Sequence, residues 1–170
     1  MISPTILYVL FILAFVVHDG EEIAVEHKWV MSHGDALCAR FPMLRRMFNH
    51  LRRMSSKAFA IAIMEELAVL VAITIYALVG GPYAVELWSV AFMVFSIHLV
   101  VHVVQAIVIK GYVPGLVTSI LLLPFSYLGM KGICQTFSIS QLLSYGAIGV
   151  MIMVSNLAFA HWLGMKMAKS

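Results

Sequence analysis

Charged residues are scarce in this 170-residue chain, in which Asp, Glu, Lys and Arg make up 11% of the sequence and hydrophobic residues 62%. A soluble globular domain is about a quarter charged and about half apolar. The composition therefore excludes an ordinary soluble domain, and the long apolar runs predict a chain embedded in lipid. At about 20 apolar residues for each helical span, the length accommodates about five spans and one polar segment.

Cysteine is equally scarce, since the chain contains only Cys38 and Cys134. Two cysteines cannot form a disulfide framework, and the topology derived below places them on opposite sides of the membrane. The N-terminal segment also lacks the basic region and the small-residue cleavage site of a signal peptide. We therefore expect the first apolar run to be retained as a span.

The apolar runs predict an all-α fold, a single polytopic transmembrane bundle over residues 1–170. The expected spans cover residues 3–26, 58–79, 84–109, 113–130 and 139–165. Between the first two spans, segment 41–54 is amphipathic at helical spacing, with arginines around an apolar face. It predicts an interfacial helix on the anionic cytoplasmic leaflet, and a solvated basic loop is the alternative.

Basic residues are distributed very unevenly along the chain. One side of the predicted bundle holds ten of the 11 Lys and Arg residues, and only Lys131 falls on the other side. The positive-inside rule then predicts an integral protein of the cytoplasmic (inner) membrane with its N-terminus outside and its C-terminus in the cytoplasm. Most of the basic residues lie in the segment next to the first span, so we expect them to bind membrane lipids rather than nucleic acid.

Ionisable side chains inside the predicted spans are the most informative feature, because they are expensive to bury and usually functional. Four spans carry polar candidates, which are His18, Glu21, Glu22, Glu65, Glu66, His98, His102, Asn156 and His161. Measured from the nearest cytoplasmic Lys, most lie roughly 8–18 Å inside the bundle. A single buried His is often only hydrogen-bonded, but a shared depth on four helices favours a common site.

Spacing and charge together favour a metal centre. His18 and Glu22 are four residues apart, as are His98 and His102, so each pair shares a helix face. No Lys or Arg lies at that depth to neutralise the glutamates, which must be protonated or bound to cations. Mixed imidazole and carboxylate ligands suit transition metals. We predict one or two divalent ions, zinc or iron before others.

Roles follow from these positions. The predicted metal ligands are His18, Glu22, Glu65, His98, His102 and His161. We expect Glu21 and Glu66 to be catalytic, as a general base or as a bridge to a second metal, because adjacent glutamates on a helix diverge by about 100°. Asn156 and Gln105 are expected to orient the metal ligands through hydrogen bonds without binding the metal themselves. Tyr112 and Thr118 are candidate hydroxyls facing the site.

The sequence HDGEE at residues 18–22 resembles the motif of the HXXEE family of bacterial integral membrane proteins. The resemblance continues through HDGEEIAVEHKW (18–29), Glu65-Glu66, HLVVHVVQAI (98–107), YVPGLVTSILLLP (112–124), Asn156 and His161. The family is largely uncharacterised. The resemblance therefore implies a buried polar centre and no particular reaction.

These observations favour a membrane-embedded metalloenzyme acting on a lipidic or apolar substrate that arrives laterally. Zinc would support hydrolysis, with a Glu taking the proton, and a di-iron centre would support oxidation. A metal-free Glu/His isomerase is the first alternative. A structural or sensory metal site also stays open, as does transport of a cation or proton. Transport is less favoured, because the predicted outer half of the bundle lacks polar residues that could continue an ion pathway.

Overall fold

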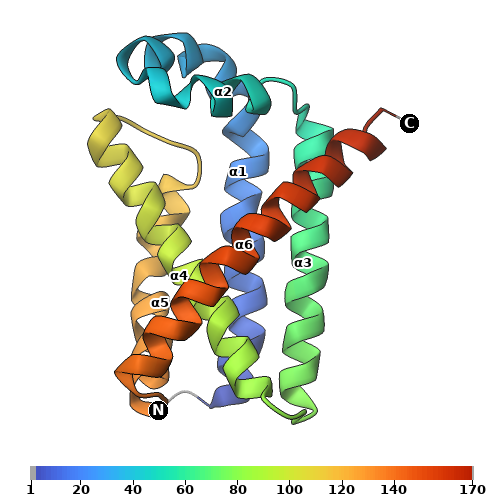
Figure 1. The fold of residues 1–170 in the computed structure, drawn as a ribbon, viewed down its shortest axis with the longest axis vertical. Coiled ribbons are helices and arrows are strands. Elements are labelled where there is room, and N and C mark those ends of the chain that lie inside the picture. The colour runs from blue at the N-terminus through green and yellow to red at the C-terminus, as the bar shows by residue number, and fades with distance from the viewer. Residues whose placement is uncertain (1–2, 170) are drawn as a thin grey trace.

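The computed structural model describes residues 3–169, a helical bundle with no β-strand in that range (Figure 1). The prediction of an all-α fold is confirmed. The six α-helices are α1 (Pro4–Arg40), α2 (Arg45–Leu51), α3 (Ser56–Leu78), α4 (Ala84–Ile109), α5 (Leu116–Thr136) and α6 (Ile139–Met167). A 3₁₀ turn, Pro42–Leu44, precedes α2.

Four helices, α3, α4, α5 and α6, are long and apolar enough to cross a membrane, so the chain is an integral membrane protein. They correspond to the last four predicted spans, although α5 continues to Thr136 instead of ending near residue 130. Helix α1 is not among the four. Its first part runs beside α3 for the height of the bundle (Figure 1), and a fifth span at residues 3–26 stays a prediction.

Helix α1 is longer than expected. The first span was predicted to end at residue 26, but the helix continues for 37 residues in total, or about 55 Å at 1.5 Å per residue. Residues 27–40 are polar but contain no proline, so nothing in their backbone interrupts the helix. Val30 and Leu37 on this extension are buried against Phe48 of α2, and that packing stabilises the additional turns.

Within residues 41–54, where an amphipathic interfacial helix was expected, the structure has the 3₁₀ turn Pro42–Leu44 and the short helix α2. Phe48 is only 2% exposed and packs against the α1 extension, so part of the apolar face is used inside the protein. Met43, in contrast, is 86% exposed. Helix α2 lies across one end of the bundle (Figure 1). Its contact with a lipid leaflet stays a prediction.

An aromatic cluster fixes α1 against α4 next to the polar residues of both helices. Phe11 contacts Phe92 edge-on at a ring-centroid distance of 5.1 Å and Phe95 at 5.2 Å. Helix α5 approaches the cluster closely at Gly129, where a Cβ would lie 2.3 Å from the Phe92 ring. His18 follows Phe11 by two helical turns and His98 follows Phe95 by one. The apolar packing thereby sets where the histidines meet.

The connection between α4 and α5 folds back against α1. It begins at Lys110 and ends at Gly115, both of which have left-handed backbone conformations. The indole of Trp29 donates to the carbonyl of Tyr112 at 2.9 Å. Arg40 donates to the carbonyl of Ile109 at 3.0 Å, at the end of α4. These contacts hold the connection beside the second half of α1.

Candidate metal centre

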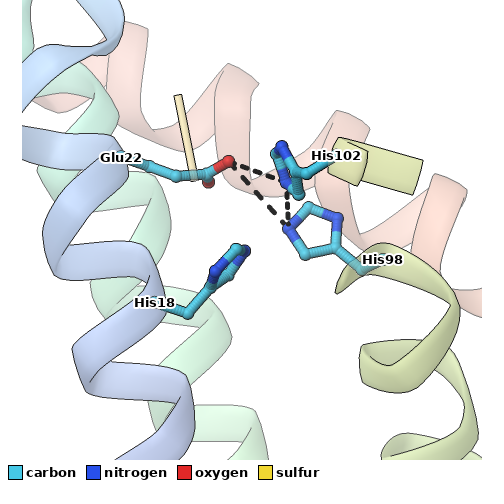
Figure 2. Close-up of side chains that lie close together, drawn as sticks. All are labelled: His18, Glu22, His98 and His102. Atoms are coloured by element: carbon cyan, nitrogen blue, oxygen red, sulfur yellow. Dashed lines mark hydrogen bonds and ion pairs between the residues drawn. The ribbon is translucent and has the colours of Figure 1, made fainter. Parts of the chain in front are cut away.

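Four side chains from two helices converge between α1 and α4. His18 and Glu22 project from α1, and His98 and His102 project from α4 (Figure 2). One potential ligand atom of each residue lies within 4.8 Å of those of the other three. We call these four residues the His/Glu group. Spacing of four residues on each helix puts both members of a pair on the facing surfaces, as predicted.

Distances inside the His/Glu group suit a single metal ion. The Nε2 atom of His102 lies 3.0 Å from Oε1 of Glu22 and 3.0 Å from Nε2 of His98. Nε2 of His98 lies 4.0 Å from the same Glu22 oxygen. Tetrahedral ligands bonded at the zinc–nitrogen distance of 2.0–2.1 Å would be about 3.3 Å apart. Small side-chain movements would therefore bring these three atoms onto one ion.

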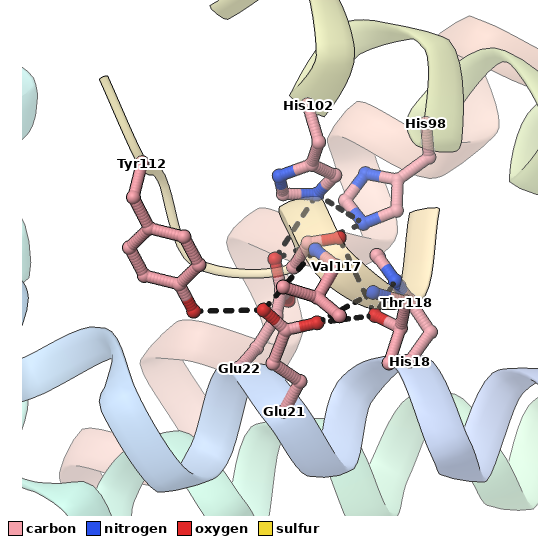
Figure 3. A network of polar contacts seen from close by, with 9 residues as sticks. His18, Glu21, Glu22, His98, His102, Tyr112, Val117 and Thr118 are labelled. Carbon is pink, nitrogen blue, oxygen red and sulfur yellow. Dashed lines mark hydrogen bonds and ion pairs between the residues drawn. The ribbon is translucent and has the colours of Figure 1, made fainter. Parts of the chain in front are cut away.

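A chain of hydrogen bonds orients His18 (Figure 3). The Thr118 hydroxyl donates to Oε2 of Glu21 at 2.6 Å, which is shorter than its alternative contact of 3.3 Å to the Gly115 carbonyl. With its only proton engaged, the hydroxyl accepts from Nδ1 of His18 at 3.0 Å. This assignment, made from the network, leaves Nε2 of His18 without a proton and free to bind a cation. Metal-binding histidines commonly have such a partner on the other ring nitrogen.

Glu21 collects donors from the beginning of α5. Besides Thr118 Oγ1, it accepts from the Thr118 backbone N–H at 2.8 Å, the Val117 N–H at 3.4 Å and the Tyr112 hydroxyl at 2.7 Å. A carboxylate is well placed there, because the first N–H groups of a helix lack partners within the helix. Glu21 thus positions Thr118 and, through it, His18. This role differs from the general base expected from the sequence.

Tyr112 belongs to the connection between α4 and α5, outside the membrane-spanning helices. Desolvation and the hydrogen bond to Glu21 raise the pKa of its hydroxyl above the ordinary value. The hydroxyl therefore keeps its proton at neutral pH and remains a donor to Glu21. The sequence offered Tyr112 and Thr118 only as candidates, and the structure connects both to His18.

Burial tests whether the His/Glu group fits a metal. His18 is fully buried and His102 is 7% exposed. Nε2 of His18 is buried with no hydrogen-bond partner, an arrangement that is costly unless another group satisfies the nitrogen. A cation held by the group would satisfy it, and three imidazoles with one carboxylate are a donor set suited to zinc or iron. The buried Nδ1 of His102 has no partner either, so the polar contacts of that ring are those of Nε2 with Glu22 and His98.

Gly115 closes the group from the α5 side. Its φ of +77° belongs to the left-handed region, which glycine adopts without strain. A Cβ at this position would lie 2.9 Å from Cε1 of His18 and 3.1 Å from both Oε1 of Glu22 and Cε1 of His102. The glycine is therefore required twice, for the turn and for the space occupied by three members of the group.

The two remaining predicted ligands lie elsewhere. Glu65 accepts a hydrogen bond from the Asn156 amide at 3.2 Å. His161 stacks on His50, with Nδ1 of His161 3.1 Å from Nε2 of His50. His50 is not among the residues predicted from the sequence. Shared depth was not enough to bring Glu65 and His161 to the His/Glu group, because depth does not determine the direction in which a helix residue points.

Two cavities adjoin the His/Glu group. The large cavity has a volume of about 960 Å³ and a mostly apolar lining from all six helices, with Glu22, His98, His102 and Gln105 in its wall. The small cavity measures about 270 Å³ and shares Glu22 and His98. Asp19 and Glu66 also line the small cavity. Asp19 was missed by sequence reasoning, although it lies inside HDGEE.

The fold and the His/Glu group define an integral membrane protein with a buried centre able to hold a metal ion. Residues 9–128 match the family described as "Protein of unknown function with HXXEE motif", and the chain belongs to this family. The matched segment contains all four members of the His/Glu group and both hydroxyl residues that lead to His18. No curated protein and no solved structure matches the chain.

Proposed function

We propose that this protein is a membrane-embedded, metal-dependent enzyme that acts on a lipidic or apolar substrate. The observation that carries the proposal is the place of Glu22, His98 and His102 in the wall of a cavity of about 960 Å³. Enzyme pockets typically combine an apolar lining with a few convergent polar groups. A structural metal site would not require a cavity of this size beside it.

Individual residues have distinct tasks in this proposal. His18, Glu22, His98 and His102 hold the ion, and Glu21 with Thr118 fixes the ring of His18. The apolar lining of the large cavity binds the substrate chain and excludes water. Zinc would supply hydrolytic chemistry, whereas iron would supply oxidation. A centre of four ligands favours one ion at the His/Glu group itself.

The location of the site supports an enzyme of the inner leaflet. The basic segment around α2 and the C-terminal ends of α4 and α6 lie at the same end of the bundle (Figure 1). The positive-inside rule assigns this end to the cytoplasm. His102 precedes Ile109, the last residue of α4, by about 10 Å of helix. A substrate chain would therefore meet the His/Glu group within the hydrocarbon layer, below the cytoplasmic surface.

Metal analysis provides the first test. The protein is purified in detergent without chelator, and its metals are measured by mass spectrometry beside the double variant His98→Ala, His102→Ala. His33→Ala is the matched control, because His33 stacks on Trp29 outside the His/Glu group. We expect near-stoichiometric zinc, iron or manganese in the native protein and in the control, and none in the double variant.

Enzyme activity requires a second measurement. Membrane lipids from cells producing the native protein are compared by mass spectrometry with those from cells producing each variant at equal levels. We expect at least one lipid or apolar species to change with the native protein and the His33→Ala control, and to stay unchanged with the double variant. Bound metal without any such change would favour a structural or sensory site. Absence of metal after reloading would leave metal-free acid–base catalysis as the better explanation.

A further inference from the structure

Carboxylates from two helices share the small cavity with the His/Glu group. Asp19 of α1 and Glu66 of α3 line it together with Glu22. The rest of the lining includes no Lys or Arg. Three carboxylates around one cavity repel each other strongly in a low-dielectric interior, so their joint ionisation requires a counter-charge.

Asp19 is the residue that needs an explanation. Its side chain is 5% exposed, and no hydrogen bond or ion pair joins it to another residue among residues 3–169. Glu21 and Glu65 differ, because the first accepts from Thr118 and Tyr112 and the second from Asn156. A buried carboxylate with no partner on another residue is very costly unless it is neutralised. Asp19 lines the small cavity and does not line the large one.

Glu22 connects the two sets of ligands. Its Oε1 atom is the oxygen that approaches His102 and His98, so Oε2 remains available on the same carboxylate. Glu22 also lines both cavities. A carboxylate in this position can bind one cation through each oxygen.

We propose that Asp19 and Glu66, sharing Glu22 with the His/Glu group, form a second divalent-cation site in the small cavity. The inference rests on the proposed function and makes the centre dinuclear. All protein ligands of this second site are oxygens, and such ligands suit manganese, magnesium or iron(II) better than they suit zinc. The volume of about 270 Å³ leaves room for a cation and several waters at about 30 Å³ each.

The two sites therefore differ in chemistry, and this difference makes them separable. The purified protein is stripped with chelator, loaded with one equivalent of zinc and titrated with manganese(II), and free manganese is followed by electron paramagnetic resonance. The variants are Glu66→Gln, the double variant Asp19→Asn, Glu66→Gln, and the control Glu65→Gln. Glu65 is adjacent to Glu66 in sequence but binds Asn156 and does not line the small cavity.

We expect zinc-loaded native protein and Glu65→Gln to bind one further manganese ion. Glu66→Gln should bind manganese at least tenfold more weakly while keeping its zinc, and the double variant should bind none. Retained zinc shows that each variant is folded around the His/Glu group. Glu66→Gln leaves α1 untouched, so the test does not depend on the tolerance of α1 to substitution.

Two results would overturn the second site. One is zinc-loaded native protein that binds no manganese, and the other is native manganese affinity in Glu66→Gln. Equal loss of manganese in Glu65→Gln and Glu66→Gln would also refute it, because the effect would not follow the cavity. Failure of the native protein to hold zinc or iron at the His/Glu group is a different result, and it would refute the proposed function itself.

Discussion

Nδ1 of His18 lies 3.0 Å from the hydroxyl of Thr118, and this contact decides which nitrogen of His18 can bind a cation. The hydroxyl gives its proton to Glu21 and receives one from His18, so Nε2 carries the free lone pair. A residue of α5 thereby controls a ligand supplied by α1. The ordering of α5 against α1 and the competence of the His/Glu group are consequently linked.

Removing the hydroxyl of Thr118 should weaken metal binding without removing a metal ligand. Thr118→Val keeps the shape of the side chain but leaves His18 without its acceptor, and loss of such partners typically costs 10–100-fold in metal affinity. Thr118→Ser restores the hydroxyl and should recover most of the affinity. Competition with a chromophoric chelator measures both values. Equal affinities of Thr118→Val and native protein would show that packing alone orients the ring.

Gly115→Ala should disrupt the His/Glu group directly. The added Cβ would come within 2.9 Å of His18, and a left-handed backbone costs an alanine about 1–2 kcal/mol. Gly111→Ala is the matched control, since a Cβ there meets nothing within 4 Å. We expect Gly115→Ala to lower both the metal content and the melting temperature, measured by mass spectrometry and thermal unfolding. Similar values for the two variants would contradict the close contact.

Single replacements of histidine distinguish ligands from neighbours at the same depth. His98→Ala should abolish stoichiometric metal binding, because it removes one of four converging donors. His161→Ala should keep the metal at the His/Glu group, because His161 pairs with His50. The measurement is the metal-to-protein ratio after purification without chelator. Loss of metal in His161→Ala would restore the ligand role that the sequence favoured.

Filling the large cavity should separate substrate binding from metal binding. Val101 lines this cavity, so Val101→Trp should occupy space needed by a substrate chain. The expected result is native metal content with a reduced change in the lipid profile. Leu121→Trp adds the same bulk to an exposed position of α5 that lines neither cavity, and it should behave like native protein. Identical lipid profiles from both tryptophan variants would argue against the large cavity as the binding site.

The predictable part of the centre came from local spacing. His18 with Glu22 and His98 with His102 are separated by one helical turn, and this separation fixes the relative direction of each pair whatever the packing. The packing then confirmed that both pairs face each other. The same rule gives no information about how one helix is rotated relative to another.

The unpredicted parts depend on that rotation and on the connections. Glu65 and Glu66 point in different directions, and only the contact of α3 with α1 and α6 decides that Glu66 reaches the small cavity. The hydrogen bonds of Glu21 could not be predicted, because its donors come from residues 112–118, more than 90 positions away in the chain. The continuation of α1 to Arg40 was not predicted, because a change to polar composition indicates the end of a membrane span but does not determine where the helix ends.

Helix α1 carries a mechanical consequence. It is one continuous helix from Pro4 to Arg40, with His18 and Glu22 near its middle and Phe48 of α2 packed against Val30 and Leu37 in its second half. The last turns of α1 lie beside α2 across one end of the bundle (Figure 1). Because the same helix carries these contacts and two ligands of the buried centre, a displacement of α2 acts on the element that holds His18 and Glu22.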